Sequence, residues 1–494
     1  MNRYKMRAVI GMVIFVGIPL LTMTCLRAGE LRIGAAQADI TPDRSIALSG
    51  QFTATITARV KSPVTVNALA LEWKEEGKPT EAAIIVSGDV CIIREGVQEQ
   101  ARMLLAKRLP DFNTKLFFLA ATHTHKAPVM DQDTYGSYDG AKMEPDEYLA
   151  FMLERIADAA EQAWNSRKPG AVAWGMGHAV VAQNRRAVYA NGAAVMYGKT
   201  DQTTFRGLEG YEDHTVDSVF FLNEDQKPLA IMVAVPCPAQ TDERGSCGNR
   251  ISADFWHDVR TGLCKTYGDE LVVLGFVGPA GDQSPHLMIR NKAETRMQKL
   301  RKLSRTQEMG RRIVNAVNET WDVVKSDVRT DLPFVHRVEL FDLPTLPISE
   351  AEYAAAKTIY SLLSIKRKQG GSEHMFKKLQ GYIVQRFEAQ QKGPLGYETE
   401  MHVLRLGDVV IATNPFELFT DYGVQIQARS PAEQTILLQL TSPRGKAGYL
   451  PTPRALAGKG YSAIPLSCLV GPEGGQMLVD RTVQSIKEIL KEGK

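Results

Sequence analysis

A pair of histidines directly after an apolar segment is the first feature of the sequence that could do chemistry. Thr122-His123-Thr124-His125 follows the run 116–121, which mixes aromatic and aliphatic residues without helical spacing. Such a run predicts a buried strand, in which residues i and i+2 point the same way. Neutral imidazole is a common metal ligand and general base when a rigid element holds it. We therefore interpret His123 and His125 as metal-binding or proton-transfer residues, the alternative being a strand cap and a solvated side chain.

A glycine-rich turn supplies the second candidate. Gly278-Pro279-Ala280-Gly281-Asp282-Gln283-Ser284-Pro285 follows the apolar run 271–277. A turn of this kind after a buried strand presents backbone N–H groups and a serine hydroxyl to a cleft. The spacing is not the GxSxG of an esterase elbow. Ser284 is therefore a candidate site residue, whose hydroxyl could act either as a nucleophile or as a hydrogen-bond donor to a developing oxyanion.

A carboxylate and an arginine pair also lie near predicted strand ends or in loops. Glu417 ends the segment Asn414-Pro415-Phe416-Glu417, directly after the predicted strand 409–413. Arg185 belongs to the loop Asn184-Arg185-Arg186, where an arginine fork suits a carbonyl or an anionic intermediate. Solvation at the surface is the alternative for the arginine pair. An open mouth of an α/β sheet would bring such strand-end residues together.

The elements that must position these residues are predicted to be alternating strands and helices. We expect an α/β fold with mixed β-sheets flanked by helices, in one domain over residues 29–494. The two helices expected at 349–367 and 374–391 are predicted to form a hairpin around Gly370-Gly371 and to act as a lid. The expected strands are 31–38, 68–73, 82–86, 116–121, 171–176, 216–222, 229–235, 271–277, 402–406, 409–413 and 435–440, and the expected helices are 96–109, one opened by Pro145, one capped by Ser252, 304–325, 349–367, 374–391 and 478–490.

Composition and the N-terminus exclude some classes of function and favour export. The 494 residues carry a net charge of only +3, which is no nucleic-acid signature, and six scattered cysteines form no disulfide framework. Arg3, Lys5 and Arg7 precede the apolar run 8–21, a pattern typical of a secretory signal. We expect a signal peptide at 1–28 and an extracytoplasmic protein, periplasmic or secreted; an uncleaved membrane anchor is the alternative.

Spaced motifs along the chain resemble the neutral, non-lysosomal ceramidase family, in its N-terminal catalytic domain. That family cleaves the amide bond of ceramide with a single zinc ion. The resemblance implies zinc ligands His123, Glu417 and Tyr449, a catalytic Ser284 and an anchoring Arg185. It also implies a supporting or proton-transferring role for His125. The motifs are ADITP at 38–42, THTH at 122–125, NR at 184–185, GDQSP at 281–285, PFE at 415–417 and GYLPTP at 448–453.

The sequence departs from the family's pattern at two places. Lys126-Ala127-Pro128 stands where the family has Ser-Gly-Pro, and Val235-Pro236-Cys237-Pro238 stands where it has the His-Pro of its second zinc histidine. A thiolate binds zinc about as well as imidazole, at about 2.3 Å. We therefore expect Cys237 to replace that histidine, the alternative being a buried, inert cysteine. We also expect no counterpart of the family's C-terminal β-sandwich domain.

Together these features predict an exported, zinc-dependent hydrolase of an amide or ester bond. Its substrate would be a small-molecule or lipid-like acyl compound, and a lipid-like one would bring the protein into peripheral contact with a membrane. Two other functions stay open: hydrolysis of glycan-linked acyl groups, and binding without catalysis on the same fold. The sequence does not indicate the oligomeric state.

Overall fold

The computed structural model describes residues 29–77, 80–241, 248–365 and 372–492. The predicted signal peptide at 1–28 and the expected turn at Gly370-Gly371 lie outside these ranges. Within them, no helix combines the length and hydropathy that crossing a membrane requires.

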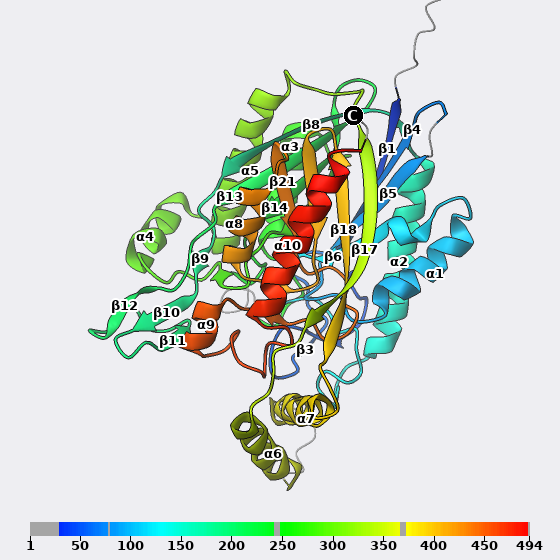
Figure 1. The fold of residues 1–494 in the computed structure, drawn as a ribbon. Coiled ribbons are helices and arrows are strands. Elements are labelled where there is room, and N and C mark those ends of the chain that lie inside the picture. Colours follow the sequence, from blue (N-terminus) through cyan, green and yellow to red (C-terminus); the bar gives the residue numbers. More distant parts are fainter. Residues whose placement is uncertain (1–28, 78–79, 242–247, 366–371, 493–494) are drawn as a thin grey trace, which may run out of the picture.

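One order of elements recurs three times along the chain (Figure 1). Each unit has three antiparallel strands, a helix, a fourth strand parallel to the third, and a second helix. Parallel neighbours need a long crossover connection, and in each unit the first helix supplies it. The first unit consists of β1 (Glu30–Asp39), β4 (Thr65–Lys74), β5 (Glu81–Gly88), α1 (Val97–Arg108), β6 (Phe117–Ala121) and α2 (Pro145–Asn165).

The second and third units repeat this plan with different residues. The second consists of β8 (Ala171–His178), β13 (Thr215–Leu222), β14 (Pro228–Val235), α3 (Phe255–Tyr267), β15 (Val272–Val277) and α5 (Arg305–Val324). The third consists of β17 (Phe334–Pro344), β18 (Gly396–Leu406), β19 (Val409–Thr413), α8 (Thr420–Arg429), β21 (Gln434–Leu438) and α10 (Pro472–Ile489).

Shorter elements connect the units or extend them. They are β2 (Ile46–Ala47), β3 (Ile56–Thr57), η1 (Thr114–Leu116), β7 (Lys168–Pro169), β9 (Gln183–Asn184), β10 (Arg186–Tyr189), β11 (Ala194–Met196), β12 (Phe205–Leu208), β16 (Gln283–Ser284), α4 (Asn291–Arg301), α6 (Glu350–Ile365), α7 (Ser372–Gln390), β20 (Glu417–Leu418), β22 (Tyr449–Leu450) and α9 (Pro453–Gly458).

The three large sheets share one central core. Phe118 of β6, Leu274 of β15 and Ile411 of β19 all belong to it and are fully buried. The outer face of each sheet packs on the helices of its own unit: α1 and α2, α3 and α5, or α8 and α10. Sheets covered on both faces need continuous apolar strands. This explains why the strands appear in the sequence as apolar runs rather than as alternating patterns.

The structure confirms the predicted α/β class with mixed sheets between helices, and it corrects some details. The strand β17 was not expected from the sequence. Helix α3 is capped by Asp254, whose carboxylate accepts from the N–H of Phe255 at 2.8 Å, and not by Ser252.

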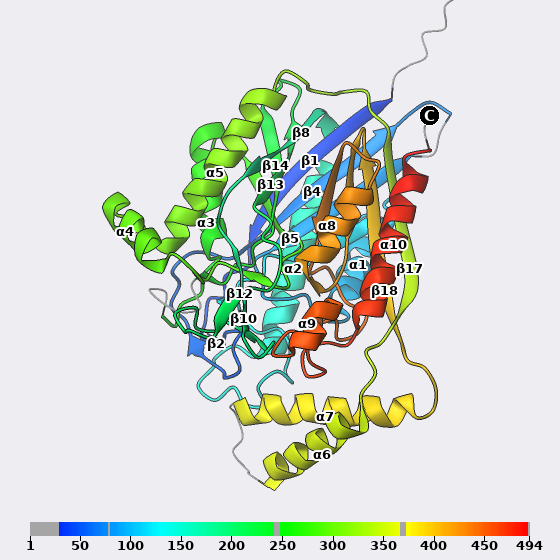
Figure 2. The same ribbon diagram turned by 60° about the vertical axis from the view of Figure 1, so that its left-hand side comes forward.

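Helices α6 and α7 lie side by side across one end of the molecule, below the ends of the sheets (Figure 2). Most side chains of α7 are half-buried, and Phe376 stacks on Phe52 with ring centroids 5.1 Å apart. Arg386 of α7 donates to the carbonyls of Cys468 and Leu346 at 3.0 and 2.7 Å, which ties the helix to the third unit. The helical pair predicted from the sequence therefore covers the end of the molecule where the site lies.

Candidate metal and catalytic site

Loops from all three units meet at the carboxyl ends of the parallel strand pairs. The N–H of Ala121, at the end of β6, donates to the carbonyl of Leu440 after β21 at 3.1 Å. The N–H of Gln439 donates to Val277, the last residue of β15, at 3.0 Å. This edge of α/β sheets is where binding sites form. The segments that follow β5, β6, β14, β15 and β19 carry Cys91, His123, Gln240, Ser284 and Glu417 respectively.

His123 is held with one ring nitrogen on the backbone and the other facing the site. Its Nδ1 lies 2.7 Å from the carbonyl oxygen of Cys91. Because a carbonyl only accepts, Nδ1 carries the proton, and Nε2 of the neutral ring presents a lone pair. Strand β6 ends at Ala121, so the histidines do not continue it as expected. Instead, His123 has a φ of 64°, and its ring lies 4.8 Å from that of His125 between centroids.

His125 completes a pair of imidazole nitrogens that face each other. Its Nε2 lies 3.1 Å from Nε2 of His123 and 2.8 Å from Nε2 of Gln240. The Oε1 of Gln240 accepts from the hydroxyl of Tyr197 at 3.4 Å, so the amide presents its NH₂ group to His125. The Nε2 of His125 is then an acceptor, like that of His123. A shared cation or proton is what stabilises two facing lone pairs.

A short parallel ladder places the carboxylate and the phenol. Glu417 of β20 pairs with Tyr449 of β22, and their side chains are hydrogen-bonded. Oε2 of Glu417 lies 3.6 Å from Nε2 of His123. Burial raises the pKa of Glu417 above its ordinary value, although Arg185 and Tyr449 oppose this effect. The pKa of Tyr449 is also raised by burial. Burial therefore shifts both groups toward their neutral forms, and the neighbouring cation of Arg185 opposes this shift.

The donor set fits a divalent metal. Two ligand atoms at roughly 2.0–2.1 Å from a tetrahedral zinc lie about 3.3 Å apart. The observed separations from His123, 3.1 Å to His125 and 3.6 Å to Glu417, are close to that value. Ligand atoms of Cys91, His123 and His125 lie within 4.8 Å of one another, the one such group found in the described part of the chain. The thiol beside the histidines is thus Cys91, which the sequence analysis did not single out.

The structure does not bring Cys237 to this group. Its side chain is fully buried in the core between β14 and α3, and its Sγ faces the carbonyl oxygens of Val181 and Pro238 at 3.9 and 3.6 Å. Burial raises the pKa of this thiol well above its ordinary value, which disfavours a thiolate. The sequence located the residue correctly after a strand. It could not reveal that the side chain points into the core.

Arg185 lies inside the site and not on the surface. The small ladder of β9 and β16 pairs Gln183 with Ser284, which sets Arg185 beside the serine turn. Its guanidinium donates to the carbonyl of Gly281 at 2.7 Å and lies 5.1 Å from the ring centre of Tyr449. Burial alone would lower the pKa of Arg185, but attraction to Tyr449, Tyr197 and Glu417 raises it above its ordinary value. Its neighbour Arg186 instead pairs with Glu209.

Ser284 has partners that the sequence analysis missed. Its Oγ lies 2.6 Å from Nδ1 of His286 and 3.2 Å from the hydroxyl of Tyr197. The rings of Tyr197 and His286 lie 4.5 Å apart between centroids. Ser284 itself is fully buried and does not line the cavity described below, whereas Tyr197 does. The available signal was a histidine two positions after the serine in a chain with only nine histidines.

A cavity of about 800 Å³ opens over these residues. His123, His125, Arg185, Glu417 and Tyr449 all line it, together with Cys91, Tyr197 and Gln240. Apolar side chains form much of the remaining wall, and α7 contributes part of it. These apolar residues are Phe52, Ile92, Met130, Leu149, Met196, Met375, Leu379, Leu440 and Leu466.

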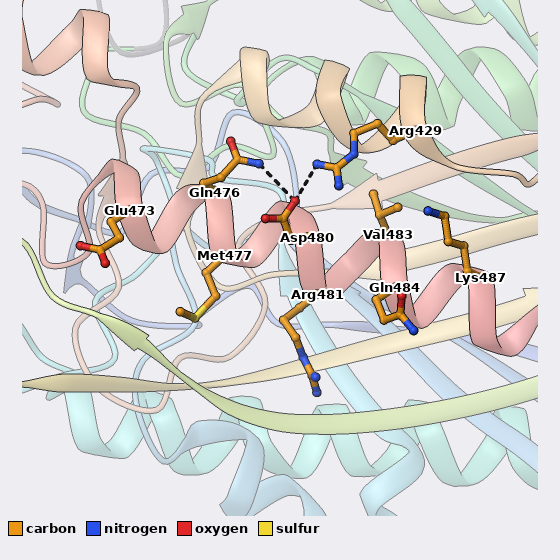
Figure 3. A pocket seen from close by; sticks show the side chains of 9 residues that line it. All are labelled: Arg429, Glu473, Gln476, Met477, Asp480, Arg481, Val483, Gln484 and Lys487. Atoms are coloured by element: carbon orange, nitrogen blue, oxygen red, sulfur yellow. Dashed lines mark hydrogen bonds and ion pairs between the residues drawn. The ribbon is translucent and has the colours of Figure 1, made fainter.

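A second hollow lies on the outer surface of α10 and has a different character (Figure 3). Its side chains are mostly charged or polar, and they come from α10 and the end of α8. Asp480 at its centre already accepts from Arg429 at 2.7 Å and from Gln476 at 3.2 Å. No group of metal-ligand or nucleophilic residues like that of the first cavity gathers among the side chains drawn there.

Comparison with known proteins supports the fold class. The chain is similar to the crystal structure of neutral ceramidase from Pseudomonas aeruginosa, with a TM-score of 0.66 and 16% identity over 93% of this chain and 75% of that one. It is also similar to a ceramidase complexed with C2, with a TM-score of 0.64 and 15% identity over 94% of this chain and 75% of that one. At such low identity the similarity establishes the fold: the protein has an α/β fold of the neutral-ceramidase type.

Sequence comparison alone does not extend this result. No family model matches the chain, and no curated protein sequence matches it either. The roles of the site residues therefore rest on their geometry.

Proposed function

We propose that this protein is an exported, zinc-dependent hydrolase that cleaves an amide or ester bond of an acyl substrate. The observation that carries the proposal is the group of His123, His125 and Glu417 in the lining of a cavity to which many apolar side chains contribute. Nitrogen and oxygen ligands in an open site are the donor set of catalytic zinc. The fold shared with ceramidase structures favours the same class of reaction.

The proposed ligands are His123, Glu417 and Tyr449, with Cys91 or His125 as the candidate for a further ligand, and the open position would take water or the substrate oxygen. Bound zinc would polarise a carbonyl and lower the pKa of a water molecule to about 7. His123 is already fixed in the tautomer that exposes Nε2, because its Nδ1 donates to a backbone carbonyl. Such a contact orients the ring and sets the ligand atom before any ion arrives.

The remaining residues of this chain would bind and orient the substrate. Arg185 carries a permanent charge and lies within the cavity beside Tyr449, where it can donate to a carbonyl or carboxylate oxygen of the acyl group. His125, held by Gln240, is placed to take or return a proton next to the ligand group. Resonance makes amides poor electrophiles, so several fixed donors around one carbonyl are needed.

The walls of the cavity favour an acyl chain as the apolar part of the substrate. Residues such as Leu379 of α7 and Leu466 face the same space as the histidines. Transfer of a methylene group from water to an apolar surface contributes about 0.8 kcal/mol, so a chain of several carbons would add substantially to affinity. A lipid-like substrate is therefore proposed ahead of glycan-linked acyl groups, which have little to place against these side chains.

Export and membrane contact complete the proposal. The charged and apolar pattern of residues 1–28 supports export. On α6, the helix outside α7, Ile359 and Leu362 are 41% and 58% exposed, which would suit shallow contact with a lipid surface. Cell fractionation of the full chain and of a chain lacking residues 1–28 tests the first point. Flotation with neutral phospholipid vesicles tests the contact of the protein with a lipid surface.

The function itself is tested by metal analysis combined with a hydrolysis screen. The purified protein is assayed on long-chain N-acyl amides, long-chain esters and acetylated sugars, before and after removal of metal by a chelator. We expect one equivalent of zinc and cleavage of a long-chain substrate that chelation abolishes and zinc restores. Cleavage of acetylated sugars alone would favour the glycan alternative. Zinc binding without hydrolysis of any substrate would favour a binding protein.

A further inference from the structure

We propose that Tyr197, Ser284 and His286 form a proton relay that delivers a proton to the leaving group of the substrate. This inference rests on the proposed hydrolase activity. The three side chains are consecutive in space: the Tyr197 hydroxyl lies 3.2 Å from Oγ of Ser284, which lies 2.6 Å from Nδ1 of His286. Both separations are within reach of a hydrogen bond between oxygen and oxygen or nitrogen.

Only one end of the relay faces the cavity. Tyr197 lines it, whereas Ser284 is fully buried and is absent from its lining. A substrate held in the cavity therefore meets the phenol and not the serine. His286, at the other end, is half-buried and so keeps access to solvent. This arrangement is poorly suited to a serine nucleophile and well suited to a chain that passes protons from solvent to the cavity.

Tyr197 is held firmly in this place. Its backbone N–H donates to the carbonyl of Arg185 at 2.8 Å, and its φ of 55° lies in the left-handed region, which an aromatic residue rarely adopts. Its hydroxyl contacts Arg185 and Gln240 at 3.4 Å each. The relay is thereby joined through Gln240 to His125, which lies 2.8 Å away from the amide. Tyr197 consequently lies between the serine turn and the histidine pair.

The proton transfers balance along this chain. When the bond from the acyl carbon to the leaving nitrogen or oxygen breaks, its electron pair stays with the heteroatom, which takes the proton of the Tyr197 hydroxyl. Tyr197 regains a proton from Ser284, Ser284 regains one from the imidazolium of His286, and His286 is reprotonated by solvent. The attacking water supplies the OH group of the carboxylic acid, and its other proton passes to solvent through His125, which balances the proton that His286 takes up from solvent. No oxidant or further reactant is needed.

Dependence on the leaving group tests the relay. An amine or alkoxide must be protonated as it leaves, whereas 4-nitrophenolate leaves without a proton. The substitutions Tyr197→Phe, Ser284→Ala and His286→Asn are compared on an alkyl ester or N-acyl amide and on the 4-nitrophenyl ester of the same acid. General acid catalysis typically contributes about 10²–10⁴-fold. We expect kcat/KM to fall by about 10²-fold or more on the first class and by less than about 5-fold on the nitrophenyl ester.

The controls separate the relay from the hydrolase proposal. Tyr189→Phe removes a hydroxyl that donates to the carbonyl of Lys199 at 2.9 Å in the same hairpin, and it should leave both rates unchanged. Equal losses on both substrates for Ser284→Ala would identify the serine as a nucleophile and overturn the relay. Unchanged rates for Tyr197→Phe would overturn it as well. If the wild-type protein cleaves none of these substrates, the proposed function itself fails.

Discussion

Nε2 of His123 lies 3.6 Å from Oε2 of Glu417, although the two residues follow strands of the first and third units of the fold. His123 follows β6 and Glu417 follows β19, and each of these strands belongs to a parallel pair. The contact therefore exists only because the three sheets pack with these carboxyl ends at one place. A metal bound here would join two units that are remote in the chain.

Replacement of His123 should remove the metal. His123→Ala eliminates the nitrogen that faces both His125 and Glu417, and we expect metal content of the purified protein to fall below about one tenth of the wild-type value, consistent with loss of one of about four ligands. His178, an exposed residue at the end of β8, provides the matched control, because His178→Ala changes the same residue type outside the site. Elemental analysis of both variants gives the answer; full metal content in His123→Ala would rule out this site.

Substitution of two of the buried cysteines, Cys91 and Cys237, should have different effects on zinc binding. We expect Cys91→Ser to weaken zinc binding and Cys237→Ser to leave it unchanged, since only the sulfur of Cys91 lies with the histidines. Cobalt(II) substitution provides a direct readout, because a cobalt–thiolate bond absorbs in the near ultraviolet. Loss of that band in Cys91→Ser alone would confirm the assignment. Its loss in Cys237→Ser would show that the ligand set predicted from the sequence forms when metal binds.

Gly281→Ala should displace Glu417, one of the proposed zinc ligands. A Cβ at this position would lie 2.2 Å from the carbonyl oxygen of Glu417, so the backbone of Glu417 must move and carry its carboxylate with it. We expect a loss of zinc affinity measured by chelator competition and a decrease of about 1–3 kcal/mol in the free energy of unfolding, as for other overpacked sites. Gly207→Ala in β12 is the control, because an added Cβ there meets no atom within 4 Å.

Glu400 should make stability depend on pH. Burial alone would raise its pKa, but hydrogen bonds from His402 and Arg102 outweigh burial and lower the pKa from 4.5 to about 2. The unfolded chain therefore binds this proton more tightly, so the ionised carboxylate stabilises the fold above about pH 4.5, and this contribution is lost as the pH falls toward 2. We expect Glu400→Gln to lower the free energy of unfolding by about 2–3 kcal/mol at pH 7.

Urea unfolding at pH 7 and at pH 3 checks this sign. The difference between wild type and Glu400→Gln should be smaller at pH 3 than at pH 7. An equal difference at both pH values would show that packing, and not charge, accounts for the loss. The control is Glu398→Gln, which changes an exposed carboxylate on the same strand, β18.

Apolar patterning in the sequence determined the identity of most elements. The runs at 116–121, 229–235 and 271–277 became β6, β14 and β15 with small shifts at their ends. The helix expected over 304–325 became α5, which begins after a capping box formed by Ser304 and Gln307. Strands buried on both faces must be apolar throughout, so their signal is local and survives without knowledge of neighbours. The α/β class followed directly from these runs.

The sequence also located the main candidate residues of the site. His123, Arg185, Glu417 and Tyr449, chosen from strand ends and motif resemblance, line one cavity. The reason given for the histidines was incomplete. The left-handed backbone conformation of His123, and not the alternation of a strand, sets the direction of its side chain. Their roles as metal ligands stay predictions.

Only the tertiary structure decided which side chains meet. The threefold recurrence of the unit has no counterpart in repeated residues, because burial constrains apolar character and not identity. Cys91 and Cys237 both follow strands in similar settings, yet one faces the cavity and the other the core. Tyr197 and His286 reach Ser284 through the pairing of β9 with β16 and the turn of the β10–β11 hairpin. Side-chain direction depends on backbone angles and packing across distant segments, which no local pattern of residues records.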